Sequence, residues 1–371
     1  MKVLQLRSEF TDNGPGTQAL TLSIELRSRG HEVIFCSSGG KLTQRILAEG
    51  FKYRFIDDLS FTKRGVLTAI RSVFKLAKVL KEEKVDVVHT HNAASLMLVN
   101  IASMIRFKKV KVFQSVHGVE KRENYQWRNA IYRYIRFEKL FAVSEHTKGN
   151  LVDFGVKEEK ILVTYNGTDL KRFDISKREA YNKEIRDEFS IPYDAKIIGI
   201  VGRQDGLKGH KFLVESFKRL YETYPNLYVI LVGEGKALER NKKLAEELDI
   251  TDRCIFVGLR FDVEKFHAAF DIFTLLSLKG YEMFPCVIIE AMAYEKTFVA
   301  TNTTGVPETA IRGEGFICEC EDVDCFVERY KQLLDNEELR ISMGKIGRRS
   351  VEKIFNIEEV VNKIENSFLG K

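Results

Sequence analysis

Short apolar runs alternate along the chain with longer stretches whose apolar residues recur at helical spacing. The first runs show this most clearly. Residues 2–7 read as a strand, residues 17–29 as an amphipathic helix closed by Gly30, and residues 31–36 as a second strand. A strand, a polar loop, a helix and another strand form the repeating unit of a parallel sheet. The pattern therefore predicts an α/β fold.

Two later strand-like runs of the first half end in histidine. Residues 85–91 form an apolar run that ends at His91, and residues 109–117 repeat this plan and end at His117. In open parallel sheets, ligands bind beyond the carboxyl ends of the strands, so both histidines are candidates for a ligand site. A histidine at a strand end is more often structural than catalytic, and both interpretations stay open on the pattern alone.

A second series of strands begins after a charged stretch that has no clear periodicity. Its strands are expected at residues 197–202, 227–232, 254–257, 272–276, 297–300 and 315–318, with helices between them. The sequence therefore predicts a second doubly wound domain. Two such domains side by side leave a cleft between their strand ends.

Length and charge agree with two domains. With 371 residues the chain exceeds the size at which a single hydrophobic core keeps growing. Residues 1–171 carry 29 Lys and Arg against 18 Asp and Glu, a net +11, whereas the remaining residues carry a net −5. A basic first half and an acidic second half indicate different partners.

Composition and cysteine spacing predict a reduced, cytoplasmic protein. The chain is 44% apolar and 30% charged, and no apolar run approaches the roughly 18 residues of a membrane span. Residues 1–7 are too short and too charged for a signal peptide. The six cysteines form no C-x2-C pair, so we expect reduced thiols and no metal site.

Basic residues of the first half gather in three segments. These are residues 61–84, expected to form a long helix with an apolar stripe, residues 106–111, and the aromatic-rich residues 128–136. One interpretation is that they dock on an anionic membrane surface. The other is that they form solvated faces that keep the domain soluble or bind an acidic glycan.

Residues 280–293 join two carboxylates to the start of a helix. Glu282 precedes Pro285, expected at the first helical position, and Glu290 follows about one turn inside the helix. The amide groups of residues 286–288 would then attract an anion, because unpaired N–H groups and the helix dipole favour negative charge. Such a stretch fits a ligand with hydroxyls and phosphate, such as a nucleotide sugar. Two acidic residues at this spacing also occur by chance.

Two cations follow the first strand of the second series. Arg203 and Lys208 lie in the glycine-rich residues 202–209. The first offers a planar fork of donors and the second a compact charge, and together they suit a leaving diphosphate. A polar turn with exposed basic side chains is an equally simple interpretation. The G-x4-G-K-[ST] spacing is absent, which excludes a P-loop.

Taken together, these motifs resemble the retaining glycosyltransferases of family 4. The resemblance rests on Arg203 with Lys208, on the Glu282-x7-Glu290 motif, and on residues 304–308, Thr-Gly-Val-Pro-Glu. It covers nearly the whole chain and is densest in the second domain. It implies the GT-B fold, in which two Rossmann-like domains face each other across the active-site cleft, and no metal or other cofactor.

The resemblance also implies roles for individual residues. Arg203 and Lys208 would bind the diphosphate, Glu290 the ribose and Glu282 the hydroxyls of the donor sugar. His117 would lie near the reacting sugar and completes the expected catalytic set. The other residues implied in nucleotide and donor binding are Gly16, Gly258, Leu259, Phe284, Pro285, Cys286 and Val287.

Domain boundaries follow from the charged stretch without clear periodicity that separates the two series of strands. We expect an acceptor-side domain at residues 1–172, a linker at 173–194 and a donor-binding domain at 195–354. A last helix within residues 355–371 would pack back onto the first domain.

Two positions depart from the family pattern. Met283 stands where the family usually has glycine, and Ser277 precedes Glu282 by five residues, where a shorter gap is usual. Both lie on the donor-sugar side of the expected site.

The function that the resemblance implies is metal-independent, retaining transfer of a hexosyl group. The donor would be a nucleotide sugar, expected to be a UDP-sugar, and the acceptor a glycan or lipid-linked glycan of bacterial polysaccharide or lipopolysaccharide synthesis. A glycoside hydrolase also uses two carboxylates but has no use for a diphosphate clamp. A nucleotide-sugar epimerase and an inactive glycan-binding partner subunit remain alternatives on the same fold. No nucleic acid partner is expected.

Overall fold

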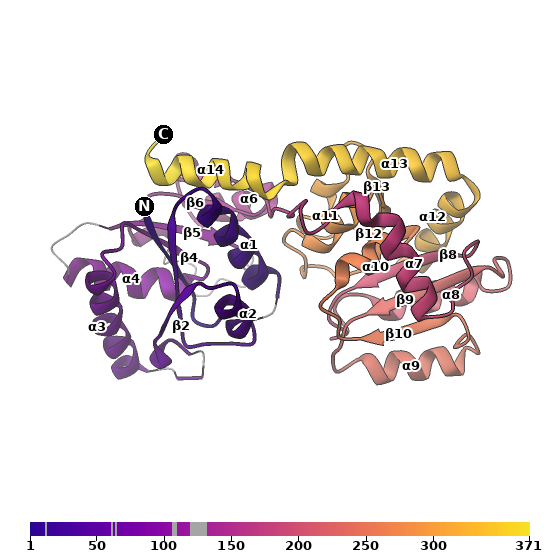
Figure 1. Ribbon diagram of the computed structural model, residues 1–371, viewed down its shortest axis with the longest axis horizontal. Helices are drawn as coiled ribbons and strands as arrows, with labels where there is room; N and C mark the ends of the chain where they lie inside the picture. Colours follow the sequence, from indigo (N-terminus) through magenta and orange to yellow (C-terminus); the bar gives the residue numbers. More distant parts are fainter. Residues whose placement is uncertain (12, 61, 64, 106–109, 119–131) are drawn as a thin grey trace. The chain divides into compact units, whose positions relative to one another are not determined.

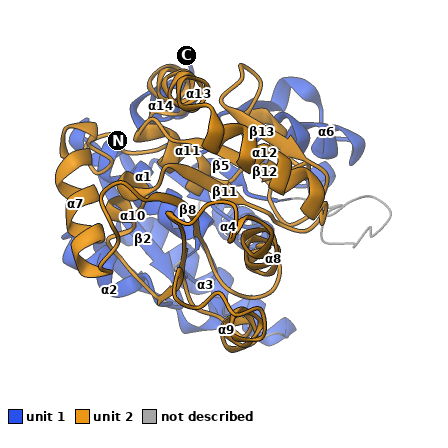
Figure 2. Ribbon diagram, turned by 90° about the vertical axis from the view of Figure 1, so that its right-hand side faces the viewer, with its two compact units in different colours: residues 1–167, 357–371 blue, residues 168–356 orange. Residues whose placement is uncertain are grey.

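The computed structural model describes residues 1–11, 13–60, 62–63, 65–105, 110–118 and 132–371. The chain folds as two compact units, coloured separately in Figure 2. The first unit contains residues 1–167 and 357–371, and the second contains residues 168–356. Each is built on one sheet whose described strands all run parallel, so the predicted class of two Rossmann-like α/β domains is confirmed (Figure 1).

The first unit has a seven-stranded sheet in the order β3-β2-β1-β4-β5-β6-β7. Its strands are β1 (Lys2–Leu6), β2 (Glu32–Ser37), β3 (Lys52–Phe55), β4 (Val87–Thr90), β5 (Lys111–Val116), β6 (Leu140–Ala142) and β7 (Ile161–Val163). The helices described are α1 (Gly14–Ser28), α2 (Thr43–Ala48), α3 (Val66–Glu82), α4 (Ala93–Ile105), α6 (Glu145–Asp153) and α14 (Ile357–Leu369).

The second unit has a six-stranded sheet in the order β10-β9-β8-β11-β12-β13. Its strands are β8 (Lys196–Val201), β9 (Leu227–Val232), β10 (Cys254–Gly258), β11 (Ile272–Leu275), β12 (Thr297–Thr301) and β13 (Gly315–Cys318). Its helices are α7 (Arg178–Glu188), α8 (His210–Leu220), α9 (Leu238–Glu247), α10 (Val263–Ala269), α11 (Cys286–Ala293), α12 (Val323–Asp335) and α13 (Glu337–Ser350).

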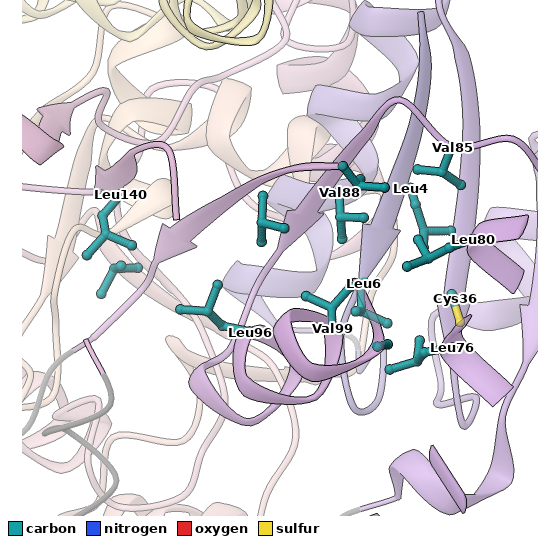
Figure 3. Close-up of a cluster of buried hydrophobic side chains, with 14 of the residues drawn as sticks. Leu4, Leu6, Cys36, Leu76, Leu80, Val85, Val88, Leu96, Val99 and Leu140 are labelled. Carbon is teal, nitrogen blue, oxygen red and sulfur yellow. The ribbon is translucent and has the colours of Figure 1, made fainter. Parts of the chain in front are cut away.

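Buried side chains cover both faces of the first sheet. Successive residues of a strand point to opposite faces, so Leu4 and Leu6 join one core while Val3 joins the other. The first of these cores takes Leu76 and Leu80 from α3, as Figure 3 shows. The sheet is therefore held between two apolar layers, which explains why its strands read as nearly continuous apolar runs.

The last helix belongs to the first unit. Apolar residues of α14, including Val361, Ile364 and Phe368, are buried in the core that also contains Leu20 and Leu26 of α1. Glu365 adds an ion pair to Arg29, with Nη1 and Oε2 2.9 Å apart. The C-terminal segment thus packs on the unit that the N-terminus begins.

The unit boundaries differ from the sequence-based expectation, because residues 168–172 and 355–356, expected in the first domain, belong to the second unit, and the expected linker does too. Residues 173–194 were expected to form a linker, but they contain α7. Arg186 of this helix is buried, donates to the carbonyl of Pro192 at 2.6 Å and lies 3.7 Å from the carboxylate of Asp271. The segment is therefore part of the second unit, and its charged residues face solvent or form ion pairs.

Two further expectations need correction. The long helix expected at residues 61–84 is described only as α3, which begins at Val66 and ends at Glu82. The cysteines were expected to be reduced, but Cys318 and Cys325 form a disulfide, with their Cα atoms 6.0 Å apart. Among the residues that the structure describes, no helix has the length and apolar character to cross a membrane.

Candidate active site

The centre of the second sheet is the place where a ligand is expected. The chain builds outward from β8 to β10 on one side and from β11 to β13 on the other, so β8 and β11 are neighbours at the point where the order reverses. Open α/β sheets bind ligands at the carboxyl ends of the strands at such a point. The segments that follow these two strands carry Arg203, Lys208 and Glu282.

Lys208 and Glu282 are brought together. The Nζ atom of Lys208 donates to Oε1 of Glu282, and the hydroxyl of Ser277 donates to the same oxygen at 2.8 Å. Glu282 is only 7% exposed, so its charge depends on these two donors. Both of these donors bond Oε1, and no described residue donates to Oε2 of Glu282. Oε2 can therefore accept a hydrogen bond from a ligand hydroxyl.

The residues between Ser277 and Glu282 form a loop that is hydrogen-bonded to the end of β12 and to the segment after it. The hydroxyl of Thr301 donates to the carbonyl of Ser277 at 2.7 Å, and the amide of Gly280 donates to the hydroxyl of Thr303 at 2.7 Å. The amide of Gly305 donates to the carbonyl of Glu282 at 3.1 Å. These bonds fix the backbone that presents the carboxylate.

Arg203 differs from Lys208 in having no buried partner. Its side chain is 65% exposed and lies 3.2 Å from Oδ2 of Asp205. An exposed ion pair of this kind contributes little to stability, so the guanidinium can exchange it for a ligand at small cost. Arg203 and Glu282 are both described, and neither a hydrogen bond nor an ion pair joins them.

Gln204 was missed by the sequence analysis. It is fully buried, donates from Nε2 to the carbonyl of Gly233 at 3.1 Å, and accepts at Oε1 from Asn241 at 3.0 Å. It therefore joins the loop after β8 to the loop after β9. The only signal in the sequence was an amide residue beside Arg203 in a glycine-rich segment.

Close backbone approaches explain two of the glycines around the site. A Cβ atom on Gly209 would lie 2.0 Å from the carbonyl oxygen of Leu276, and one on Gly233 would lie 2.0 Å from that of Gly202. Both glycines also have positive φ, +78° and +132°. The loops after β8, β9 and β11 can pack together only because these side chains are absent.

Glu290 has a separate partner. It lies in the second turn of α11, and its Oε2 atom is 3.4 Å from Nε2 of the fully buried His267. His267 was also missed, because nothing in the sequence links a histidine of α10 to this carboxylate. Pro285 is the N-cap of α11, with ψ 112°, rather than its first residue, so the helix begins at Cys286.

The remaining expected donor residues lie at the carboxyl edge of the same sheet or at the start of α11. Phe284 is buried and packs on Phe355, with ring centroids 5.3 Å apart. Val287, in the first turn of α11, is half-buried. Gly258 ends β10 with φ +79° and open space where a Cβ would stand, and Leu259 beside it is half exposed.

Gly16 lies in the first unit and has a local reason to be glycine. A Cβ atom there would lie 2.1 Å from the carbonyl oxygen of Thr11. Its amide donates to the side chain of Asn13, the N-cap of α1, at 3.1 Å. The expectation was that this glycine lets a ligand approach, but the packing of its own loop already requires it.

His117 also lies in the first unit, directly after β5. Its Nε2 atom is 3.2 Å from Nδ1 of His91, which follows β4, and the two rings stack. Burial, with the nearby positive charge of Arg7, lowers the pKa of His117 to about 3. The ring is therefore neutral at physiological pH and cannot act as a cation there.

Among the residues that the structure describes, no three or more His, Cys, Asp and Glu side chains are grouped so that they could hold a metal ion. The charged side chains expected at the site in the second unit are Arg203, Lys208, Glu282 and Glu290.

Two doubly wound units, one of them with a lysine–carboxylate pair at its switch point, define a protein of the two-Rossmann-domain class. Family models match both halves: "Glycosyltransferase Family 4" over residues 12–172 and "Glycosyl transferases group 1" over residues 182–350. The chain belongs to glycosyltransferase family 4, as the sequence motifs predicted.

Individual relatives cover nearly the whole chain. The N-acetyl-alpha-D-glucosaminyl L-malate synthase of Bacillus anthracis is 27% identical over 96% of this chain and 93% of its own. An Escherichia coli enzyme, UDP-Gal:alpha-D-GlcNAc-diphosphoundecaprenol alpha-1,3-galactosyltransferase, is 26% identical over 91% of this chain and 88% of its own.

Solved structures show the same fold. A glycosyltransferase from Rickettsia africae matches with a TM-score of 0.86 at 23% identity, over 99% of this chain and 98% of its own. HepE from Anabaena, solved with UDP, matches with a TM-score of 0.85 at 18% identity over all of both chains. The GT-B fold expected from the sequence is thereby confirmed.

Proposed function

We propose that this glycosyltransferase moves a sugar from a UDP-sugar to a glycan or lipid-linked glycan in bacterial polysaccharide synthesis, with retention of configuration and without a metal ion. The observation that carries the proposal is the contact of Lys208 with Glu282 at the switch point of the second sheet. It places a cation that suits a diphosphate beside a carboxylate that suits sugar hydroxyls.

The names of two similar proteins support the donor and the acceptor class, whereas the Bacillus anthracis relative is named for a small acceptor, L-malate. The Escherichia coli relative is named for UDP-Gal and for an acceptor on diphosphoundecaprenol, and a Staphylococcus aureus relative is a capsular polysaccharide glycosyltransferase. HepE has been solved with UDP-glucose. A UDP-sugar donor and a glycan acceptor are therefore the first substrates to test.

The mechanism follows from the charges. As the bond between sugar and diphosphate breaks, negative charge grows on the diphosphate, and Arg203 with Lys208 stabilises it. The leaving phosphate oxygen takes the proton of the acceptor hydroxyl, which attacks the same face of the sugar. Glu282 holds the sugar hydroxyls and Glu290 the ribose, so that the reacting atoms stay aligned.

A donor panel tests the proposal. Purified protein is heated with UDP-, GDP- and ADP-sugars, and the shift of the melting temperature is measured. A ligand present at about 100 times its dissociation constant stabilises by roughly 2.7 kcal/mol, so binding is readily detected. We expect UDP-sugars to stabilise the chain, also after treatment with EDTA. Stabilisation by no nucleotide sugar would contradict the proposal.

Product analysis separates the alternatives. A transferase releases UDP and needs an acceptor. An epimerase changes the sugar without an acceptor, and an inactive partner subunit binds the donor without any turnover.

We also propose that the first unit docks on an anionic membrane. Large apolar side chains at the start and in the middle of α3 face solvent, with Val66 77%, Leu67 73% and Phe74 60% exposed. Lys78 and Lys81 are exposed on the same helix. Apolar side chains beside basic ones are typical of helices that lie in a membrane interface. Residues 106–109 and 119–131, which contain much of the other basic charge, lie outside the described residues.

Vesicle co-sedimentation tests the docking. We expect binding to vesicles that contain anionic lipid, a decrease with salt, and a loss when Lys78 and Lys81 become Glu, because each basic residue contributes about 1 kcal/mol near such lipid. The matched control changes Lys242 and Lys243 of α9 to Glu and should bind as the wild type does. Equal binding to neutral and anionic vesicles would overturn the docking.

A further inference from the structure

Three polar side chains form a line of hydrogen bonds in the first unit, on β1 and at the carboxyl ends of β4 and β5. Oε1 of Gln5 lies 2.8 Å from Nε2 of His91, and Nδ1 of His91 lies 3.2 Å from Nε2 of His117. Gln5 and His91 are buried, while His117 is half-buried. Nδ1 of His117 has no hydrogen bond to a residue that the structure describes. The line therefore begins inside the sheet and ends at His117.

Both rings are neutral at physiological pH. Burial removes the water that would solvate an imidazolium, and the neighbouring His89, His117 and Arg7 further disfavour a charge on this ring, so the pKa of His91 lies well below its usual value. Burial and Arg7 likewise lower the pKa of His117 to about 3. A neutral imidazole carries one N–H and one bare nitrogen.

This rule and the orientation of the Gln5 amide together fix where the protons lie. The structure places the amide oxygen of Gln5 toward His91 and leaves its Nε2 buried without a hydrogen-bond partner among the described residues. An amide oxygen only accepts, so Nε2 of His91 carries the hydrogen and donates to it. Nδ1 of His91 is then bare and accepts from the N–H at Nε2 of His117. His117 has no second N–H, and its Nδ1 is left as an acceptor.

We propose that Gln5 and His91 are positioning residues that hold His117 in the Nε2–H tautomer, so that its bare Nδ1 accepts a hydrogen bond from a sugar hydroxyl. The role toward a sugar rests on the proposed function, since only the family resemblance places His117 near the reacting sugar. The tautomer follows from the hydrogen bonds together with the orientation of the Gln5 amide.

Nitrogen NMR of the full chain tests the proposal directly. Two-bond 1H–15N correlation spectra of protein labelled at histidine show which ring nitrogen carries the proton, and His117→Gln identifies the signals of that ring. We expect Nε2 protonated and Nδ1 bare throughout pH 6 to 8. A protonated Nδ1, which the opposite amide orientation of Gln5 would produce, or an imidazolium in this range would overturn the proposal.

Substitutions test whether His91 sets the tautomer. His91→Asn keeps an oxygen acceptor near the position of Nδ1 and should preserve the pattern at His117. His91→Leu removes it and should give a mixture of both tautomers. Gln5→Leu should have the same effect, and it serves as the second variant if His91→Leu does not fold. An unchanged pattern in both leucine variants would show that the line does not position His117.

A matched control comes from the same strand. His89 is buried two residues before His91, but its Nε2 atom bonds the hydroxyl of Ser115 at 2.9 Å rather than His117. His89→Asn should leave the signals of His117 unchanged, and a tautomer mixture in this variant would count against the specific role of His91. If the chain showed the expected tautomer but no transferase activity, the proposed function would be disproved, whereas the tautomer assignment would stand.

Discussion

Glu282 and Glu290 lie eight residues apart in the sequence, yet their surroundings give them different tasks. Glu282 is nearly buried and receives hydrogen bonds from Lys208 and Ser277, whereas Glu290 faces His267 from the second turn of a helix. In the proposed mechanism, the carboxylate beside the lysine lies where the diphosphate and the sugar meet. Differences between substitutions at the two positions therefore test the assignment of roles.

Glu290→Gln should weaken UDP binding, because its proposed partner is the ribose, and Glu282→Gln should leave UDP binding nearly intact while it impairs sugar transfer. Isothermal titration with UDP, combined with a transfer assay, measures both effects. If both variants lost UDP affinity equally, the division of roles would have to be abandoned.

Arg203→Ala should lower kcat/KM by roughly ten- to a hundredfold or more, because a hydrogen bond to a charged group contributes about 1.5–3 kcal/mol. Its exposed side chain predicts little change in melting temperature. Arg219→Ala is the control, since Arg219 is similarly exposed and pairs with Asp324 on the surface. Activity of Arg203→Ala equal to that of the control would refute the diphosphate role.

The buried histidines predict a loss of stability in acid. Burial lowers the pKa of His89 and His117 to about 3, far below the value near 6.5 expected in the unfolded chain. Between these values the unfolded state binds more protons, so the free energy of unfolding should fall as the pH drops below about 6.5. Each histidine contributes up to about 1.4 kcal/mol per pH unit.

Chemical denaturation between pH 7 and pH 4 measures this slope. His89→Gln should reduce it by up to one proton. A slope that is the same in wild type and His89→Gln would show that His89 does not carry this linkage.

At the scale of elements, the site depends on loops that pack at van der Waals distance. The loop after β8 touches the segment after β11 at Gly209, and the loop after β9 touches the loop after β8 at Gly233. Sequence patterns predicted the strands and the segments after β8 and β11 that carry Arg203, Lys208 and Glu282, although the helix begins one residue later than expected, at Cys286. They gave no information on how the loops between these strands meet.

Gly209→Ala should therefore destabilise the second unit more than Gly258→Ala does. Both glycines have φ near +78°, which costs an L residue about 1–2 kcal/mol. Only at Gly209 would the new Cβ also meet a carbonyl oxygen, that of Leu276 at 2.0 Å. Thermal melting measures the difference. Equal decreases of the melting temperature in the two variants would show that the close contact with Leu276 does not add to the loss of stability.

The part of the site that the sequence could not predict depends on contacts between distant segments. Gln204 and His267 act through partners in other elements, so no local spacing reveals them. The disulfide of Cys318 with Cys325 was missed because composition indicated reduced thiols. Helix α7, which lies within the expected linker of residues 173–194, was also missed. Its face toward solvent is almost entirely charged, and this weakens the apolar periodicity on which helix prediction depends.

At the scale of the whole molecule, the two units have sheets of the same class but carry different functional side chains. The second unit holds the lysine–carboxylate pair and the carboxylate of α11, which suit a nucleotide sugar. The first unit presents histidines at its strand ends and exposed apolar and basic residues on α3, which suit an acceptor and a membrane surface. The basic and acidic halves of the sequence correspond closely to these two units.

The most direct test of the account is the acceptor-dependent release of UDP by the purified chain. The UDP-sugar that gives the largest thermal stabilisation is incubated with and without lipid-linked glycan acceptors, and released UDP and glycosylated acceptor are measured together. The account predicts that UDP release depends on the acceptor, equals the sugar transferred, and falls at least about tenfold in Arg203→Ala. Conversion of the donor sugar without UDP release, or firm donor binding with no transfer to any acceptor, would contradict it.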